Sequence, residues 1–381
     1  MIVSGILFWY PLAGVTFQFL HYLLGLRRLG YDVHYVEDSS RWIYDPRINA
    51  PGSDASYNVA AVAPTLEAYG FAGCWVFRGN YDGGSCYGMS ERALEQLYRE
   101  ADVLLNVTGA QELREEQLGI PRRVYVESDP FANQVKAEAG DPHNQEMLRG
   151  HDTHFTFGEN VGTPHSSAPT AGFTWLPTRQ PVCLDLWEND VDHPGRRYTT
   201  ITTWHHKGKD VVYRGETYRW TKDREFLRLI DLPRRRPVEF ELAVLADECS
   251  LELLGGHGWL HRGALELSAD PGRYRDFIRG SRAEFTVARD QYVRPRTGWF
   301  SDRSACYLAS GRPVITQDTG FGRVLPTGSG LFAFTTEDDV LAAVDSIERD
   351  PAGHCRAARE IAHDYFDAER VLQSLMERAG L

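Results

Sequence analysis

Polar residues stand directly before a short run of small and apolar residues in the stretch GWFSDRSACYLASGRPVITQDTGFG, residues 298–322. The order predicts a polar loop, a helix, a tight turn, a buried strand and a second polar loop. Unpaired N–H groups at a helix N-terminus bind phosphate, and nearby guanidinium groups add charge-assisted hydrogen bonds. We therefore expect this loop and helix start, with Arg296, Ser301, Asp302, Arg303 and Ser304, to hold a polar ligand. The stretch also fits a plain helix cap, with Ser301 as the N-cap residue.

The elements that would position this site begin with a βαβ unit. An apolar run of strand length (1–10) is followed by a loop, a helical pattern that ends at Gly30, and a second strand. Gly14 lies at the first carboxyl-edge loop, where it would let backbone approach a phosphate or an acceptor molecule. The loop lacks the GxGxxG spacing, so a nicotinamide or flavin fingerprint is absent. Further strand patterns near 74–79, 101–109, 122–130 and 153–160 predict a doubly wound parallel sheet.

A second alternation of strands and helices starts after a segment rich in Pro, Trp and acidic residues. We expect an α/β protein with two facing Rossmann-like domains and a C-terminal helical tail. The expected parts are an N-terminal domain (1–182), a linker (183–197), a C-terminal domain (198–352) and closing helices (353–381), the last of which crosses back to the first domain. Because ligands bind at the carboxyl edge of such sheets, both polar loops of the opening stretch would face the cleft between the domains.

The composition narrows the class of protein. A chain of 381 residues with 25% charged residues suits two globular domains. Its net charge of -12 argues against nucleic acid and against a polybasic membrane patch as partners. Six scattered cysteines predict free thiols in a reducing compartment. The first 26 residues are uncharged unless His21 is protonated, but they lack a basic start and a small-residue cleavage site, so we expect an unanchored cytoplasmic protein.

The stretch ASGRPVITQDTG resembles the segment with which GT-B glycosyltransferases grip the diphosphate and sugar of an activated donor. The resemblance extends over about 200–335 and, over the first domain, consists of the βαβ order alone. One feature departs from the commonest retaining bacterial type, which carries two glutamates separated by seven residues. Gly298 and Cys306 occupy those two positions here. The absence of the two glutamates favours an inverting reaction.

The resemblance implies that a nucleoside diphosphate sugar binds mostly on the second domain, with no metal and no other cofactor. Its diphosphate would contact the first polar loop and the helix start: Arg296, Ser301, Asp302, Arg303 and Ser304. Lys207, one of only four lysines, would add to this diphosphate site. A carboxylate beside an amide can accept and donate hydrogen bonds to adjacent hydroxyl groups, so the sugar would contact the second polar loop: Gln317, Asp318, Thr319 and Gly320. Trp259 and Trp204 suit a platform for the nucleotide base, although an ordinary strand–turn or loop aromatic fits each equally well.

The first domain would bind the acceptor and supply a general base, which an inverting transfer requires. Asp129 is the first candidate because it follows an apolar strand, and Glu127 and His21 are the others. The apolar neighbours of His21 also fit a core histidine. Adjacent His205 and His206 would face opposite sides of a strand and have no third ligand at useful spacing, so we expect no metal site.

The aromatic segments of the first domain allow an apolar acceptor such as a bacterial natural-product aglycone. Two other functions remain open on the same scaffold. One is a nucleotide-sugar epimerase, which would use water in place of a second substrate. The other is a non-catalytic protein that binds a sugar nucleotide, which the two missing glutamates make conceivable.

Overall fold

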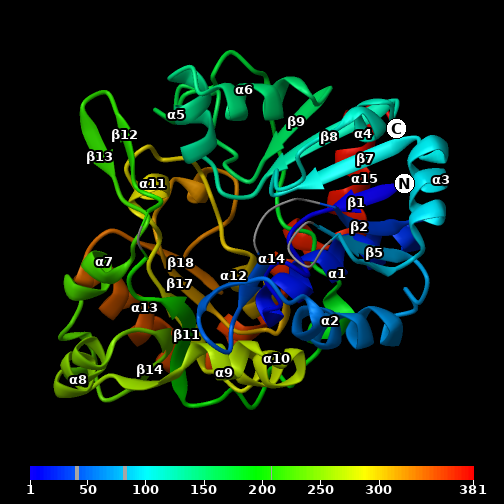
Figure 1. The fold of residues 1–381 in the computed structure, drawn as a ribbon. Helices are drawn as coiled ribbons and strands as arrows, with labels where there is room; N and C mark the ends of the chain where they lie inside the picture. Colours follow the sequence, from blue (N-terminus) through cyan, green and yellow to red (C-terminus); the bar gives the residue numbers. More distant parts are fainter. Residues whose placement is uncertain (39–42, 80–83, 207) are drawn as a thin grey trace.

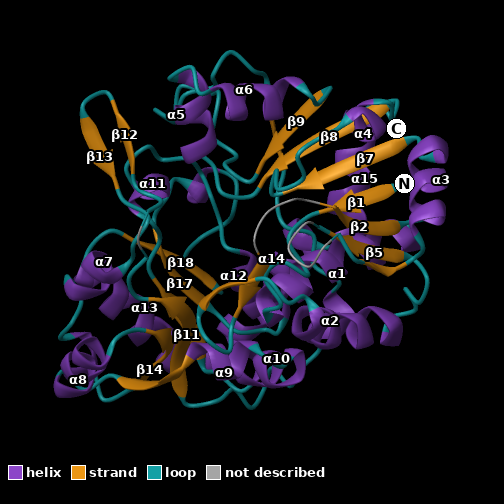
Figure 2. Ribbon diagram, viewed as in Figure 1, coloured by secondary structure: helices purple, strands orange, loops and turns teal. Residues whose placement is uncertain are grey.

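The computed structural model describes residues 1–38, 43–79, 84–206 and 208–381. Figure 1 shows two α/β domains side by side, with the start and the end of the chain both in the first domain. Each domain is built on one sheet, and helices flank it (Figure 2). The expected fold class is therefore confirmed.

The N-terminal sheet has eight strands, and its order places the first strand near the centre. All neighbours are parallel except the last pair, β5 and β6, which is antiparallel. In spatial order the strands are β10 (Trp175–Pro177), β9 (Thr153–Thr156), β8 (Arg122–Glu127), β7 (Val103–Val107), β1 (Ile2–Ser4), β2 (His34–Asp38), β5 (Trp75–Arg78) and β6 (Cys86–Gly88). The central strands are apolar and almost entirely buried, as expected for a parallel sheet covered on both faces.

Helices and one hairpin complete this domain. The helices are α1 (Ala13–Arg28), α2 (Ser56–Ala68), α3 (Glu91–Glu100), α4 (Glu115–Leu118), α5 (Ala132–Glu138) and α6 (Pro142–Arg149). The antiparallel hairpin consists of β3 (Ile43–Asp45) and β4 (Ala50–Gly52).

The first apolar run forms a shorter strand than the sequence predicts. Strand β1 ends at Ser4, and the chain turns at Gly5, where an added Cβ would lie 1.9 Å from the ring of Phe19. The buried Glu37 carboxylate accepts hydrogen bonds from the backbone N–H groups of Phe8 and Trp9, at 2.8 and 2.6 Å. The apolar residues after Ser4 thus form a pinned loop at the carboxyl edge of the sheet.

The C-terminal sheet has six strands, all parallel. In spatial order they are β15 (Leu260–Gly263), β14 (Glu239–Leu245), β11 (Arg197–Thr203), β16 (Ala283–Thr286), β17 (Val314–Gln317) and β18 (Leu331–Phe334). The helices are α7 (Asp223–Leu227), α8 (Glu248–Gly256), α9 (Ala264–Ser268), α10 (Pro271–Arg279), α11 (Asp290–Val293), α12 (Asp302–Ala309), α13 (Glu337–Arg349), α14 (Pro351–Phe366) and α15 (Ala368–Arg378). The stretch 298–322 adopts the predicted order of loop, helix, turn, strand and loop.

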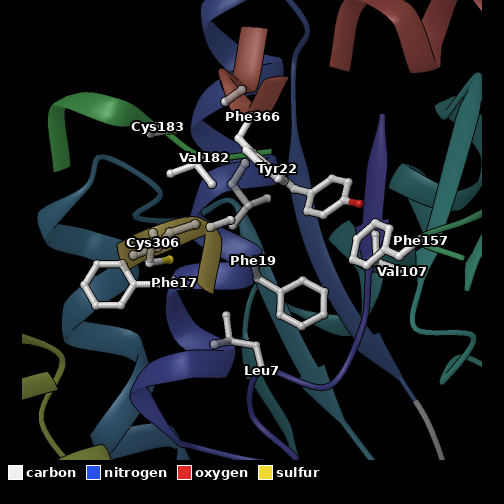
Figure 3. Close-up of a cluster of buried hydrophobic side chains, with 14 of the residues drawn as sticks. Leu7, Phe17, Phe19, Tyr22, Val107, Phe157, Val182, Cys183, Cys306 and Phe366 are labelled. Atoms are coloured by element: carbon white, nitrogen blue, oxygen red, sulfur yellow. The ribbon is translucent and has the colours of Figure 1, made fainter. Parts of the chain in front are cut away.

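The end of the chain packs against the first domain. Helix α15 lies on α1, so closely that a Cβ at Gly25 would be 2.5 Å from the Leu372 side chain. A hydrophobic cluster continues from α1 through the linker to α12 and α14, and Figure 3 shows Phe17, Val182 and Cys306 together within it. No helix among the described residues is both long and apolar enough to cross a lipid bilayer.

Two further sets of contacts join the two domains. Asn160, after β9, donates through its side-chain amide to the carbonyl oxygens of Arg296 and Gly320, both at 3.2 Å. A hairpin of the C-terminal domain, β12 (Val211–Tyr213) with β13 (Glu216–Tyr218), reaches across to α5 (Figure 1). There the Phe131 ring lies 4.5 Å from that of Tyr218.

Replacing Asn160 with alanine should destabilise the joint between the domains. The change removes the side-chain donor of the Arg296 carbonyl oxygen and one of the two donors of the Gly320 carbonyl oxygen, which costs about 1–3 kcal/mol. We expect a lower melting temperature by calorimetry. The matched control is Gln373→Ala, which removes an exposed hydrogen bond to Glu377 and should change stability by less than about 0.5 kcal/mol. Equal melting temperatures for Asn160→Ala and the wild type would show that this joint carries no stability.

Candidate functional site

A cavity of about 450 Å³ opens between the two domains at the carboxyl ends of their sheets. The loops after β1 and β8 line it from the N-terminal domain, and the ends of β11 and β14 line it from the C-terminal domain. Six of the residues selected from the sequence meet here: Gly14, His21, Asp129, Ser301, Asp302 and Arg303. The cavity is the place where the α/β fold concentrates loops, as expected for ligand binding between two doubly wound sheets.

Helix α12 points its N-terminus at this cavity. Ser301 has the extended backbone of an N-cap residue, with φ -88° and ψ 139°, but its hydroxyl makes no capping hydrogen bond. The plain helix cap considered from the sequence is thus present in the backbone but not in the side chain. The serine hydroxyl and the helix N-terminus therefore line the cleft together, an arrangement that suits an anion.

Arg303 is part of the cleft wall. Its Nε donates to Glu284 at 2.6 Å, and its two terminal nitrogens donate to the Ile201 carbonyl oxygen at 2.7 Å and to Thr286 at 3.0 Å. Glu284 is completely buried, so this guanidinium balances a charge that would otherwise stand alone in the core. Three of its five N–H directions are therefore used inside the protein.

Two cations that sequence reasoning missed line the same cavity, Lys222 and Arg289. Lys222 precedes α7 and is only 8% exposed, and its ammonium group has no hydrogen-bond or ion-pair partner among the described residues. Burial is the main cause that holds the pKa of Lys222 well below its ordinary value of 10.5, and Arg303 and Arg289 lower it further. The negative charge of an anionic ligand would favour the charged ammonium group and raise this pKa again.

Arg289 follows strand β16 at the carboxyl edge. Its guanidinium lies 3.8 Å from the ring centre of Trp220, which lines the cavity beside it, and donates to the Tyr292 hydroxyl at 3.0 Å. Because Arg289 follows the apolar strand β16, the rule that polar residues after apolar strands face the cleft would also have selected it. The rarity of lysine was the one signal available for Lys222.

Asp129 is the carboxylate that the N-terminal domain brings to the cavity. Its Oδ1 accepts a short hydrogen bond from the Tyr292 hydroxyl and lies 3.4 Å from a terminal nitrogen of Arg289. The neighbouring Ser128 carbonyl accepts from the Trp299 indole at 2.8 Å. Side chains of the C-terminal domain therefore hold this loop of the N-terminal domain, while the Asp129 side chain stays 46% exposed.

Glu127 and His21 are occupied inside the protein. Glu127 is buried and accepts hydrogen bonds from Tyr125 at 3.0 Å and Asn133 at 2.9 Å, and burial raises its pKa to about 7. His21 borders the cavity, but its Nε2 accepts the Trp187 indole N–H at 3.0 Å, and burial lowers its pKa to about 3. His21 is therefore a core histidine, as its apolar neighbours in the sequence also allowed. Neither Glu127 nor His21 presents a free basic atom to the cleft.

The second polar loop lies beside the cavity, at the joint between the domains. Asp318 accepts from the Gly320 backbone N–H at 2.7 Å and from Arg296 at 3.1 Å, which pairs two of the predicted ligands with each other. Gln317 donates to Glu225 at 2.7 Å, and the Thr319 hydroxyl donates to the Trp299 carbonyl oxygen. None of these predicted ligands borders the 450 Å³ cavity: Arg296, Gln317, Asp318, Thr319 and Gly320.

Both candidate base platforms lie in the core of the C-terminal domain. Trp204 is 4% exposed and stacks with Phe226, and Trp259 is 2% exposed and donates to the Ile230 carbonyl oxygen at 2.8 Å. Their ring faces are covered by neighbouring aromatic side chains. The expectation that they stack on a base is therefore corrected, because strands from different parts of the chain bury them.

Two more predicted phosphate ligands differ in their placement. Ser304 is buried inside α12, and its hydroxyl has no hydrogen-bond partner and does not border the cavity. Lys207 lies outside the described residues. Within the described ranges, no group of three His, Cys, Asp or Glu side chains is arranged to hold a metal ion.

No protein-family model matches the sequence, and no curated protein is significantly similar to it. Solved structures do resemble the fold over nearly the whole chain. An α-glucosyltransferase in complex with UDP and a 13-mer DNA superposes with a TM-score of 0.57 at 10% identity, covering 100% of this chain and 98% of that one. Alr3699/HepE from Anabaena, in complex with UDP, gives 0.55 at 12% identity, with 100% and 98% covered.

A third similar structure is AviGT4, a glycosyltransferase involved in avilamycin A biosynthesis, with a TM-score of 0.53 at 12% identity and coverage of 96% and 89%. At such low identity these similarities report the fold and not the substrates. The likeness extends through both domains and the helical tail. The chain therefore has the GT-B fold of nucleotide-sugar glycosyltransferases.

Proposed function

We propose that this protein transfers a sugar from a nucleoside diphosphate sugar to the hydroxyl group of an acceptor. The observation that carries the proposal is a buried lysine without a partner, Lys222, on the cleft of a GT-B fold. Arg289 and the N-terminus of α12 stand at the same cavity. A diphosphate brings the negative charge that Lys222 lacks, and structural neighbours contain UDP.

The two cations support a reaction that proceeds without a metal ion. The leaving diphosphate gains negative charge as the sugar–phosphate bond breaks, and fixed positive groups in a water-poor cleft stabilise that charge strongly. Lys222 and Arg289 would supply this stabilisation in the proposed mechanism. Arg303 would stabilise the leaving diphosphate less, because its positive charge is already paired with Glu284.

The N-terminal wall of the cavity suits an acceptor with an apolar, ring-shaped part. Tyr10 and Tyr44 border the cavity with their rings 5.4 Å apart, and Leu12 and Phe17 continue this wall. His21 adds no positive charge there because burial keeps it neutral. We therefore propose an apolar acceptor such as a bacterial natural-product aglycone.

An inverting course places the acceptor hydroxyl between this wall and the sugar carbon. The hydroxyl then needs a carboxylate at hydrogen-bond distance. Asp302 of the second domain brings one carboxylate to the cleft, and of the three bases expected from the first domain Asp129 alone does so. Its loop is held by the C-terminal domain, so the two halves of the reaction site are assembled together.

Nucleoside diphosphates should stabilise the protein, and Lys222→Met should weaken the effect. A ligand at 100 times its dissociation constant adds about 2.7 kcal/mol to the stability of the native state. We expect UDP to raise the melting temperature without Mg²⁺. Loss of one charge-assisted contact, about 1.5–3 kcal/mol, should weaken UDP binding about tenfold to hundredfold in Lys222→Met.

The matched control is Lys136→Met, which removes an exposed lysine away from the cavity. It should leave the UDP-dependent shift unchanged. Comparing UDP, dTDP, GDP and ADP identifies the nucleotide base that the protein prefers. No shift with any of them would overturn the proposed function.

Replacing Tyr10 with alanine should affect the acceptor and leave the donor untouched. A ring contact of this kind contributes about 0.5–1.5 kcal/mol beyond the area that it covers. We expect the KM for phenolic acceptors in an assay of sugar transfer to rise by up to about tenfold, while the melting shift with UDP stays as in the wild type. Release of UDP with an altered free sugar in the absence of any acceptor would instead indicate an epimerase.

A further inference from the structure

Asp302, the first residue of α12, borders the cleft with an unpaired carboxylate. Only its own backbone N–H donates to it, and no side chain of another described residue does. Neighbouring Arg303 turns away from it toward Glu284. Asp302 therefore differs from Asp129, whose Oδ1 is held by Tyr292 and Arg289.

The surroundings of Asp302 are mostly apolar. Phe17, Val182 and Cys306 border the same cavity and lie together in the hydrophobic cluster (Figure 3). The charged or titratable groups around it come from α12, from α1, from α10, from the loop after β8 and from the cations of the C-terminal domain: Arg303, Cys306, His21, Tyr22, Tyr274, Asp129, Lys222 and Arg289.

In these surroundings the pKa of the Asp302 carboxyl group lies near neutral pH. Burial is the largest cause that raises the pKa of Asp302 to about 7, and the negative charge of Asp129 adds to it. The His21 ring is neutral at this pH and does not oppose the effect. A group that is half ionised at neutral pH combines a populated basic form with a useful affinity for a proton.

We propose that Asp302 is the general base of the transfer and that Asp129 is a fixed charge that tunes it. The inference rests on the proposed glycosyl transfer. The acceptor oxygen forms a bond to the anomeric carbon, and the bond between that carbon and the phosphate oxygen breaks. The bonding electron pair leaves with the nucleoside diphosphate, beside Lys222 and Arg289. The proton of the acceptor hydroxyl passes to a carboxylate oxygen of Asp302.

The two cleft carboxylates then have separate roles because their environments differ. Asp129 has a hydroxyl and a guanidinium donor at one oxygen, which fixes its position. Asp302 has no such donor, so its proton affinity changes freely with the charge around it. Carboxyl groups whose environments push their proton affinities apart are the usual arrangement for acid–base work at neutral pH.

The first test is direct titration of the protein without substrate. Carbon-13 NMR of aspartate carboxyl groups should show one that titrates with a midpoint near pH 7, and the nearly isosteric Asp302→Asn should remove that signal. In Asp129→Asn the midpoint should move to lower pH, because a negative charge near Asp302 is gone. Absence of a signal near pH 7 that Asp302→Asn removes would overturn the inference whatever the activity.

The second test is turnover of UDP-glucose with phenolic acceptors. Asp302→Asn should lower kcat at least about 100-fold, within the range of general-base catalysis, while the UDP melting shift stays intact. In the wild type kcat should rise with pH up to about pH 7, because the base acts in its ionised form. Asp129→Asn should keep this rise, displaced to lower pH, and the exposed Asp276→Asn should match the wild type.

These outcomes separate the two proposals. A UDP shift together with normal turnover in Asp302→Asn contradicts the role of Asp302 alone. A pH-independent rate in Asp129→Asn, with the rise intact in Asp302→Asn, assigns the base to Asp129 instead. Failure of the wild type to bind any nucleoside diphosphate overturns the proposed function, while the NMR titration still decides the state of Asp302.

Discussion

A lysine ammonium group stands almost completely buried at the cleft of this protein, and no carboxylate among the described residues pairs with it. Such a group loses the solvation of water and gains little in return, so its charged form is disfavoured until an anion arrives. An anion that binds beside Lys222 would therefore gain a strong electrostatic contact. Two arginines that line the same cavity do not supply a counter-charge. Both are already paired with carboxylates, Arg289 with Asp129 and Arg303 with Glu284.

One of these cations, Arg289, also connects the two domains. Arg289 belongs to the C-terminal domain and holds Asp129 of the N-terminal domain, while Tyr292 and Trp299 hold the same loop. A ligand that binds Lys222 and Arg289 therefore acts on the joint as well as on the cleft. Asn160 completes the joint beside Gly298, where it binds the loop that carries Gly320. The polar loop expected to hold the sugar is used here for contact between the domains.

Much of the fold followed from local patterns. The alternation of strands and helices, the second domain, and the order of elements in 298–322 were all predicted from periodicity and turn residues. The first apolar run was predicted too long, because Glu37 and Phe19 end strand β1 through contacts distant in the sequence. The hairpin of β12 and β13 was also missed, since its short strands are stabilised by aromatic packing on α5.

The sequence by itself determined where polar groups follow apolar strands and where a helix N-terminus meets them, because these features depend on neighbours within a few residues. Only the tertiary structure decided which of those groups face the cleft. Glu127 and Asp129 are two residues apart, yet one is buried among donors and the other borders the cavity. Trp204 and Trp259 are covered by strands from other parts of the chain. The direction and solvation of a side chain depend on partners distant in the sequence, and those partners come together only when the sheets and domains are packed.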